Sequence, residues 1–343
     1  MTNNEFSEVK VLLASPKRIV LIPHKNADGD AMGSCLGMYH FLKDKKHNVK
    51  VVSPNTYPNF LKWMPGADDV IQFDYQNQQS KRYIDKADLI FLLDFNELGR
   101  VGNEMQKHLE TYKGTFIMID HHQQPSAIAK YLFSDTSMCA TAQMIYHFLE
   151  KIDEVKSITP EIATCLYTGI LTDTGSFRFP NTTPTTHKIA ADLIEKGANN
   201  SDIYNNIYDT NSYGRLQLLG QSLKNLKIDE KHNTAYITLT DAEKSANNFS
   251  KGDTEGIVNY ALSIKNIIFG VIFIEDKEQK IIKISFRSKG SFSVNQFARN
   301  HFEGGGHDNA AGGRSEENME DTIKRFLSLL PQYKEALNNS YVN

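Results

Sequence analysis

Aspartate and histidine residues gather where three short apolar runs of the chain end. They lie in His24–Asp30 after the first run, at Asp94 at the end of the second, and in Asp120–His122 at the end of the third. A fourth acid, Asp173, closes a stretch with helical spacing. Hard divalent ions such as Mn²⁺ and Mg²⁺ prefer oxygen ligands, and Mn²⁺ also accepts imidazole. These residue types therefore predict a site for divalent ions.

The spacing within the first segment, HxxxDxD, is suited to a pair of ions. Two ions about 3.5–4 Å apart need a bridging carboxylate and several terminal ligands. Gly29 is expected to let the chain turn tightly, so that Asp28 and Asp30 face different ions from one loop. A single acid at the end of a strand is usually a turn or helix-cap residue. Acids or histidines at all three run ends favour a metal site, since bound cations relieve the repulsion among clustered carboxylates.

The elements that must position these residues follow from the apolar pattern. Arg18–Pro23, Val49–Ser53, Asp88–Asp94 and Thr115–Asp120 read as buried strands, and Ala31–Lys45 has helical spacing. Strands alternating with helices predict an α/β fold, a mostly parallel sheet with helices on both faces. Ligands of such sheets bind outside the carboxyl ends of the strands. Further helices are predicted at Cys139–Lys151, Glu161–Thr172, Thr185–Lys196 and Ser201–Lys227.

The pattern changes near Lys227 and predicts a second, smaller α+β domain. Strands are expected at Thr234–Thr240, Ile267–Ile274 and Lys280–Arg287, and helices near Thr254–Ser263, Val294–His301 and Met319–Tyr333. We expect a metal-binding domain over residues 1–200, a helical connector over 201–229 and a substrate-binding domain over 230–343. Ile267–Ile274 is either an interior strand or part of a homodimer interface.

The second domain also carries candidates for substrate binding. Three consecutive glycines before His307 would let backbone amides approach an anion closely, and His307 would contact phosphate or ribose. Arg287 closes a predicted strand and matches phosphate bidentately, with the Ser288 hydroxyl beside it. Arg100 either reaches the metal site or lies on the surface. The candidate substrate-binding residues are Arg287, Ser288, Gly304, Gly305, Gly306, His307 and Arg100.

The motifs together resemble a known family. Asp120–His122 resembles the signature of the DHH phosphoesterases, and the HxxxDxD loop, Asp94 and Asp173 are similar to that family's other metal motifs, in the same order. The run Gly304–Gly312 resembles the glycine-rich motif of the DHHA1 domain. The resemblance spans nearly the whole chain. It is strongest to the short cytosolic nanoRNase/pAp phosphatases.

The resemblance implies a fold, an activity and a set of roles. It implies a DHH domain and a smaller DHHA1 domain across a cleft, which hydrolyse short RNA to mononucleotides and 3′-phosphoadenosine 5′-phosphate (pAp) to AMP. The implied cofactor is two Mn²⁺ ions, with Mg²⁺ or Co²⁺ as substitutes. Asp120 would orient the histidines, and His122 would lie either behind the metal ligands, in contact with them, or near the scissile phosphate. The implied ligands are His24 and Asp28 for one ion, Asp30, His121 and Asp173 for the other, and Asp94 for both.

Bulk properties limit the partners and the compartment. The net charge of −3 and the pI of about 6.4 argue against a large basic surface for long nucleic acid. They do not exclude a small basic pocket, so they are compatible with the short RNA or small nucleotides that the resemblance implies as partners. The longest apolar run, Ile267–Ile274, falls short of the roughly 20 residues of a membrane helix. The first residues have no signal-peptide core, and three scattered cysteines fit a reducing compartment, so we expect a cytoplasmic protein without membrane partners.

Two other functions remain open at this point. One is a phosphodiesterase of linear or cyclic diadenylate, which overlaps with activity on short oligonucleotides. The other is a non-catalytic nucleotide-binding regulator, against which the intact set of candidate ligands argues. Larger exonuclease relatives carry additional domains, and pyrophosphatase relatives have a different C-terminal domain. The sequence leaves the preferred substrate, the cleavage polarity, the metal and the oligomeric state open.

Overall fold

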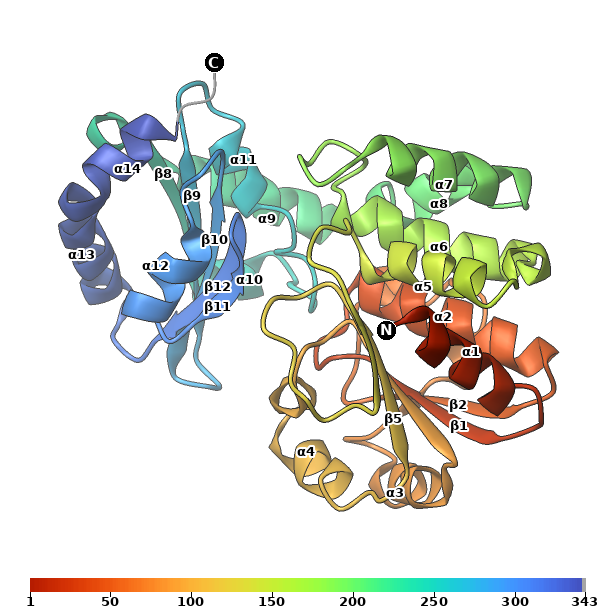
Figure 1. The fold of residues 1–343 in the computed structure, drawn as a ribbon. Coiled ribbons are helices and arrows are strands. Elements are labelled where there is room, and N and C mark those ends of the chain that lie inside the picture. The colour runs from red at the N-terminus through yellow and green to blue at the C-terminus, as the bar shows by residue number, and fades with distance from the viewer. Residues whose placement is uncertain (341–343) are drawn as a thin grey trace. The chain divides into compact units, whose positions relative to one another are not determined.

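The computed structural model describes residues 1–340, which form two compact units (Figure 1). The N-terminal unit is Met1–Thr210 and the C-terminal unit begins at Asn211. The helix expected over Ser201–Lys227 is two helices, α8 (Asn200–Tyr208) and α9 (Tyr213–Lys224), because Ser212 accepts a hydrogen bond from the Arg215 amide and starts a new helix. The expected connector over 201–229 is thus divided between the units. No helix among the described residues is long and apolar enough to cross a membrane.

The N-terminal unit is built on a parallel sheet of six strands, as the α/β pattern predicts. In spatial order the strands are β3 (Ile71–Gln72), β2 (Asn48–Ser53), β1 (Arg18–Ile22), β4 (Leu89–Leu93), β5 (Thr115–Asp120) and β6 (Tyr131–Ser134). The chain builds outward from β1 to β3 on one side and then from β4 to β6 on the other. The strand order therefore reverses between β1 and β4, the place where parallel sheets bind ligands.

Helices cover both faces of this sheet (Figure 1). Ile19 and Leu21 of β1 pack into the larger core, whereas Val20 and Ile22 point into the smaller one, because successive strand residues face opposite sides. On the larger core lie α1 (Asn3–Leu12), α2 (Gly29–Asp44), α5 (Thr141–Lys151) and α6 (Pro160–Asp173), with α7 (Pro184–Glu195) and α8 packed on α6. On the smaller core lie α3 (Asn77–Lys86) and α4 (Asn103–Leu109). Short 3₁₀ turns are η1 (Asn59–Leu61), η2 (Ala67–Asp69), η3 (Leu98–Val101) and η4 (Val155–Ser157).

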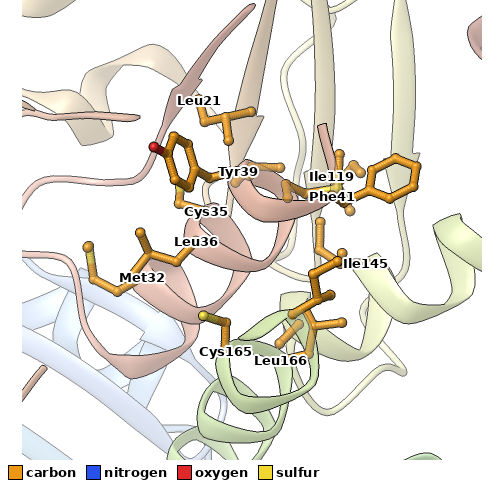
Figure 2. Packing of buried hydrophobic residues seen from close by; sticks show 14 of the residues in the cluster. Leu21, Met32, Cys35, Leu36, Tyr39, Phe41, Ile119, Ile145, Cys165 and Leu166 are labelled. Carbon is orange, nitrogen blue, oxygen red and sulfur yellow. The ribbon is translucent and has the colours of Figure 1, made fainter. Parts of the chain in front are cut away.

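Helices α2 and α6 approach each other closely along a stripe of glycines. Gly29, Gly33 and Gly37 share one face of α2, because residues four apart lie one above the other. A Cβ at Gly33 would lie 2.5 Å from the Cys165 carbonyl oxygen, and one at Gly37 would lie 2.8 Å from Leu166 Cδ2. Figure 2 shows Cys165 and Leu166 of α6 beside the side chains of α2.

This antiparallel packing brings the start of α2 to the end of α6. A Cβ at Gly29 would overlap the Thr172 side chain. Gly29 is the first residue of α2 and has no positive φ, so the prediction that it makes a tight turn is wrong. Its missing side chain instead permits contact with Thr172, which places Asp28 and Asp30 beside the helix that ends at Asp173.

The C-terminal unit has a second, mixed sheet. In spatial order its strands are β11 (Gly305–His307), β12 (Ala310–Ser315), β10 (Ile281–Ser288), β9 (Phe269–Asp276), β8 (Thr234–Leu239) and β7 (Lys227–Asp229). Only β8 and β9 are parallel neighbours among these strands. The run Ile267–Ile274 belongs mainly to β9, which is paired on both edges and is thus an interior strand.

Helices also cover both faces of this second sheet (Figure 1). A phenylalanine-rich core that includes Phe269, Phe286, Phe297 and Phe326 lies under one layer of helices. That layer consists of α12 (Val294–His301), α13 (Met319–Leu329), η6 (Leu330–Tyr333) and α14 (Lys334–Asn339). The opposite face packs against α9 and α11 (Val258–Leu262), and the remaining short helices are η5 (Glu230–His232) and α10 (Asp241–Ala246).

Candidate active site

The predicted acids and histidines meet at the carboxyl edge of the N-terminal sheet. His24 lies two residues beyond β1, Asp94 directly follows β4, and Asp120 ends β5, and these three strands are adjacent. Asp94 was predicted to end a strand, but β4 stops at Leu93 and Asp94 has a left-handed φ of 67°. Such conformations are uncommon outside glycine, although aspartate tolerates them, and they cluster at functional sites.

The two oxygens of Asp94 face two different histidines. Oδ2 lies 3.6 Å from His24 Nε2, and Oδ1 lies 3.6 Å from His121 Nε2. The Asp94 side chain is only 2% exposed, so both oxygens are withdrawn from bulk water. A carboxylate in this position can serve two cation sites at once.

The first site combines His24 with Asp28. His24 Nε2 lies 3.8 Å from Asp28 Oδ2, while His24 Nδ1 is paired with the Lys25 carbonyl at 2.9 Å. Asp28 is also the N-cap of α2, because its Oδ1 accepts hydrogen bonds from the Asp30 and Ala31 amides. The cap role and the ligand role are therefore compatible, since each uses a different oxygen.

The second site is centred on His121. Its Nε2 lies 3.5 Å from Asp173 Oδ2 and 3.9 Å from Asp30 Oδ2. His121 Nδ1 is paired with the Met138 carbonyl at 3.1 Å, which directs Nε2 toward the acids. The structure thus brings together six of the residues predicted from the sequence as ligands, His24, Asp28, Asp30, Asp94, His121 and Asp173.

The start of α5 supports this cluster and was not predicted from the sequence. The N-cap position is Ala140, which supplies no capping side chain. The Thr141 and Ala142 amides instead donate to Asp30 at 2.6 and 2.8 Å, and the Thr141 hydroxyl donates to Asp94 Oδ1 at 2.8 Å. A helix that begins without a capping residue, in a chain with clustered acids elsewhere, is the signal that could have indicated this contact.

The cluster has the electrostatics of a site built for cations. Burial lowers the pKa of His24, but Asp94 and Asp28 outweigh burial and raise that pKa to about 9. Burial, followed by the neighbouring carboxylates, raises the pKa of Asp30 well above its usual range. Burial also raises the pKa of Asp173 to about 7, with Asp28 and Asp94 adding to it. Carboxylates this crowded retain protons unless positive charge replaces them.

The donor set fits divalent ions of the Mn²⁺ or Mg²⁺ type. The distances of 3.5–3.9 Å between imidazole nitrogens and carboxylate oxygens exceed hydrogen-bond length. Ligand atoms about 2.1 Å from one ion lie about 3.0–3.5 Å from each other, so small closures of these gaps would form coordination shells. Asp120 Oδ2 is buried and accepts no hydrogen bond from the described residues, as expected beside a site for a cation or a bound water.

Asp120 orients one histidine of the pair. Its Oδ1 is paired with His122 Nδ1 at 2.7 Å, whereas His121 is oriented by Met138. The expectation that Asp120 orients both histidines is therefore met only for His122. His122 Nδ1 also lies 3.8 Å from Asp94 Oδ1, which places this ring beside the two candidate ion sites.

The backbone of Arg100 lies beside the segment that carries His24. This residue belongs to η3, is exposed, and its carbonyl accepts a hydrogen bond from the Lys25 amide at 2.8 Å. The positive charge of Arg100 makes the smallest contribution to the pKa of His24, which it lowers.

Arg287 and His307 lie on one face of the C-terminal sheet. Both pair with Ala310 in the strand between them, Arg287 on β10 and His307 on β11. Residues directly opposite in neighbouring strands share a face. This face is opposite to the phenylalanine-rich core, to which Phe286 belongs. Both side chains are half-buried, and Arg287 Nη1 donates to the Phe286 carbonyl.

The glycine run and Ser288 have internal roles that were not expected. The amides of Gly304 and Gly306 donate to the Ala298 carbonyl and to Asn295 Oδ1, so they are not displayed to an anion. A Cβ at Gly306 would lie 2.5 Å from the Ala310 carbonyl oxygen, so this glycine permits tight pairing of β11 with β12. The Ser288 hydroxyl donates to the Phe292 carbonyl and accepts from Asn309, which uses it within the fold.

Comparisons with known proteins agree with this architecture. Residues 18–170 match the model described as "DHH family, N-terminal domain", and residues 233–336 match the "DHHA1 domain". A Thermus thermophilus protein named bifunctional oligoribonuclease and PAP phosphatase NrnA is 32% identical over 88% of this chain and 86% of its own length. A Bacillus subtilis protein with the same name is 29% identical over 86% and 88%.

Solved structures extend the comparison to the fold. An exopolyphosphatase-related protein from Bacteroides fragilis is 38% identical, covers 98% of each chain and superimposes with a TM-score of 0.94. RecJ from Thermus thermophilus, solved in complex with Mn²⁺, is 12% identical with a TM-score of 0.57, covering 97% of this chain and 55% of its own, which shows a shared fold. With both domains matched in order and relatives above 30% identity over most of its length, the chain belongs to the DHH/DHHA1 family of phosphoesterases.

Proposed function

We propose that the protein is a two-metal phosphoesterase that hydrolyses short RNA oligonucleotides to mononucleotides and pAp to AMP. The observation that carries the proposal is Asp94, whose two oxygens each face one of two histidine-containing groups at the sheet's ligand-binding edge. Two relatives, from Thermus thermophilus and Bacillus subtilis, are named for this pair of activities. Their similarity covers both domains, which supports a shared substrate class.

The proposed ligands of one ion are His24 and Asp28, and those of the other are Asp30, His121 and Asp173, with Asp94 shared. The mixture of carboxylates and imidazoles suits Mn²⁺, with Mg²⁺ or Co²⁺ as substitutes. Two such ions, when bound, supply Lewis acidity and lower the pKa of a shared water so that it can attack phosphorus near neutral pH.

His122 is proposed to act on the substrate itself. Its hydrogen bond through Nδ1 to Asp120 leaves the lone pair of the neutral ring on Nε2. An imidazole held in this way presents Nε2 to the scissile phosphate, where it can hold or pass a proton. Asp120 maintains the tautomer, since its buried carboxylate favours the proton on Nδ1.

The C-terminal unit is proposed to bind and recognise the substrate. Arg287 and His307 share a face of the sheet, where the guanidinium matches a phosphate and the imidazole a phosphate or ribose hydroxyl. Gly304, Gly305, Gly306 and Ser288 are proposed to shape this face, because the amides of Gly304 and Gly306 and the Ser288 hydroxyl are occupied within the fold. Arg100 is proposed to contact a phosphate beside His24.

The test is a panel of substrates incubated with purified protein and Mn²⁺. The panel contains an RNA ladder of two to five nucleotides, pAp, linear and cyclic diadenylate, and polyphosphate, the last because of the name of the Bacteroides fragilis relative. An Asp120→Ala/His121→Ala variant controls for contaminating nucleases. Mononucleotides from the ladder and AMP from pAp would support the proposal.

Other results of the panel would redirect the assignment. Turnover confined to a diadenylate would move the protein to signalling-nucleotide hydrolysis, and turnover confined to polyphosphate would replace the nucleotide substrate altogether. If folded protein hydrolyses none of these substrates with Mn²⁺, Mg²⁺ or Co²⁺, the proposed activity is wrong and a nucleotide-binding role becomes the better account.

A further inference from the structure

Thr141 joins the two halves of the metal cluster. It is the first residue of α5 and its side chain is fully buried. Its amide donates to Asp30 Oδ2 at 2.6 Å, and its hydroxyl donates to Asp94 Oδ1 at 2.8 Å. One residue therefore holds a proposed ligand of the second ion with its backbone and the shared ligand with its side chain.

The hydroxyl restricts how Asp94 can be used. A carboxylate oxygen offers two lone-pair directions, and the hydroxyl proton occupies one of them on Oδ1. The same oxygen lies 3.6 Å from His121 Nε2, so one direction remains for the ion on that side. Asp94 Oδ2 is left for the ion beside His24, because this oxygen lies 3.6 Å from His24 Nε2.

We infer that Thr141 is a positioning residue whose hydroxyl keeps Asp94 in a bridging orientation, with one oxygen toward each ion. The inference rests on the proposed two-metal function. Without the hydroxyl, the Asp94 carboxylate is able to rotate about Cβ–Cγ and bind a single ion through both oxygens. The first ion then binds at near-normal strength, and the second loses its shared ligand.

The chemistry of the side chain makes this role separable from packing. Thr141→Val keeps the size and the β-branch but removes the donor, and Thr141→Ala removes the donor without adding a methyl beside the carboxylate. Thr141→Ser keeps the hydroxyl. All three leave the amide hydrogen bond to Asp30 in place, so they test the hydroxyl alone.

A matched control comes from the C-terminal unit. Thr322 is also fully buried, and its hydroxyl donates to Ser315 Oγ at 2.9 Å, away from any proposed ligand. The same hydroxyl lies 3.4 Å from the Glu317 carbonyl, so Thr322→Val removes a buried hydroxyl and its hydrogen bonds and leaves Asp94 unchanged. It reports what the loss of such a bond does to folding alone.

The experiment measures Mn²⁺ binding to the full-length proteins by calorimetry and by electron paramagnetic resonance. We expect wild type, Thr141→Ser and Thr322→Val to bind two ions and to show the spectrum of an exchange-coupled pair. For Thr141→Val and Thr141→Ala we expect the second dissociation constant to rise by about 10- to 100-fold, the usual effect of removing a group that orients a metal ligand. Their spectra should be dominated by isolated Mn²⁺.

Three outcomes would overturn the inference. Coupled pairs with wild-type affinity in both Thr141→Val and Thr141→Ala would show that the hydroxyl does not hold the bridge. Failure of Thr141→Ser to restore the pair would assign the effect to packing, as would equal losses in Thr322→Val. Wild-type protein that binds no ion pair would instead remove the proposed function, which distinguishes that failure from a failure of Thr141.

Discussion

Asp94 carries more of the proposed chemistry than any other residue, because it is the only one shared between the two proposed ion sites. Replacing it by asparagine keeps its shape but removes the negative charge and one acceptor oxygen. Metal-assisted stabilisation is worth several kcal/mol, and each 1.36 kcal/mol is tenfold in rate. We therefore expect Asp94→Asn to lower the rate of RNA dinucleotide hydrolysis by about 1,000-fold or more.

The matched control for this variant is Asp153→Asn, since the Asp153 side chain is 84% exposed in the same unit. It should hydrolyse the dinucleotide at the wild-type rate. Steady-state assays with Mn²⁺ measure both variants. An Asp94→Asn protein that keeps more than a tenth of the wild-type rate would show that no shared carboxylate is needed.

Metal binding should depend on pH in a direction fixed by the crowded carboxylates. In the metal-free protein Asp173 has a pKa of about 7, raised first by burial. A proton must therefore leave Asp173 before this carboxylate can bind a cation. As the pH falls through about 7 the protonated fraction grows, so the apparent affinity for Mn²⁺ falls. His24, with a pKa of about 9, must also lose a proton on binding.

Calorimetry in buffers of different ionisation enthalpy measures the protons released. More protons should be released per Mn²⁺ at pH 6 than at pH 8, because at pH 8 only His24 of these two groups is still protonated. Equal release at both values, or tighter binding at pH 6, would contradict the assignment of Asp173 as a ligand.

At the scale of elements, the α2–α6 contact decides whether the acids meet. A Cβ at Gly33 would lie 2.5 Å from the Cys165 carbonyl oxygen and 2.9 Å from the Gly169 amide nitrogen, both backbone atoms that cannot rotate away. Overpacking of this kind typically costs 1–3 kcal/mol. We expect Gly33→Ala to lower the free energy of unfolding by about 2 kcal/mol and to weaken Mn²⁺ binding, because α6 carries Asp173.

Gly220 provides the control for this prediction. It lies within α9, and a Cβ there would meet no atom within 4 Å. Alanine is favoured over glycine in helices by up to about 1 kcal/mol, so Gly220→Ala should stabilise the protein slightly or leave it unchanged. Urea unfolding compares the two variants. Equal stability of both would show that α2 and α6 do not pack as closely as described.

These elements show what a sequence can and cannot predict. The apolar period placed α2 and α6 to within two residues at each end, because α2 is buried between the sheet and α6, and α6 is buried against α2 and α5. The acids and histidines at the strand ends were expected to lie together because the strand ends of a parallel sheet converge, whereas the assignment of ligands to each ion, Asp173 included, came from the family resemblance. The hydrogen bond from the Thr141 amide to Asp30, whose partners lie 111 residues apart in the sequence, was not predicted, since no local pattern requires it. The hairpin of β11 and β12 was missed because its glycines suggest a loop.

At the scale of the whole molecule, each unit has its own hydrophobic cores, and no core cluster among the described residues draws on both. The residues proposed as metal ligands all belong to the N-terminal unit. We therefore expect a fragment of residues 1–210 to fold and to bind Mn²⁺ as the full chain does. It should not hydrolyse the RNA dinucleotide measurably, because it lacks Arg287 and His307.

Circular dichroism tests whether the fragment folds, and calorimetry tests whether it binds Mn²⁺. A separate full-length variant, His307→Ala, tests whether the loss of His307 explains the missing hydrolysis. That variant should bind Mn²⁺ normally and show a raised KM for the dinucleotide. A folded fragment that cannot bind Mn²⁺ would show that the C-terminal unit contributes to the metal site. A fragment that hydrolyses the dinucleotide at the full-length rate would remove its proposed role as substrate reader.

The glycine stripe between α2 and α6 has a consequence for genetics. In a saturation screen for loss of activity, position 33 should tolerate almost no substitution and position 29 few, whereas position 37, which faces the end of the Leu166 side chain, should tolerate alanine. None of the three carries a side chain that could touch a metal or a nucleotide. A screen that scores growth alone would rank position 33 with the aspartates. Alleles at position 33 should be temperature-sensitive, because they lower stability and leave the ligands in place, whereas alleles at Asp94 should be null at every temperature.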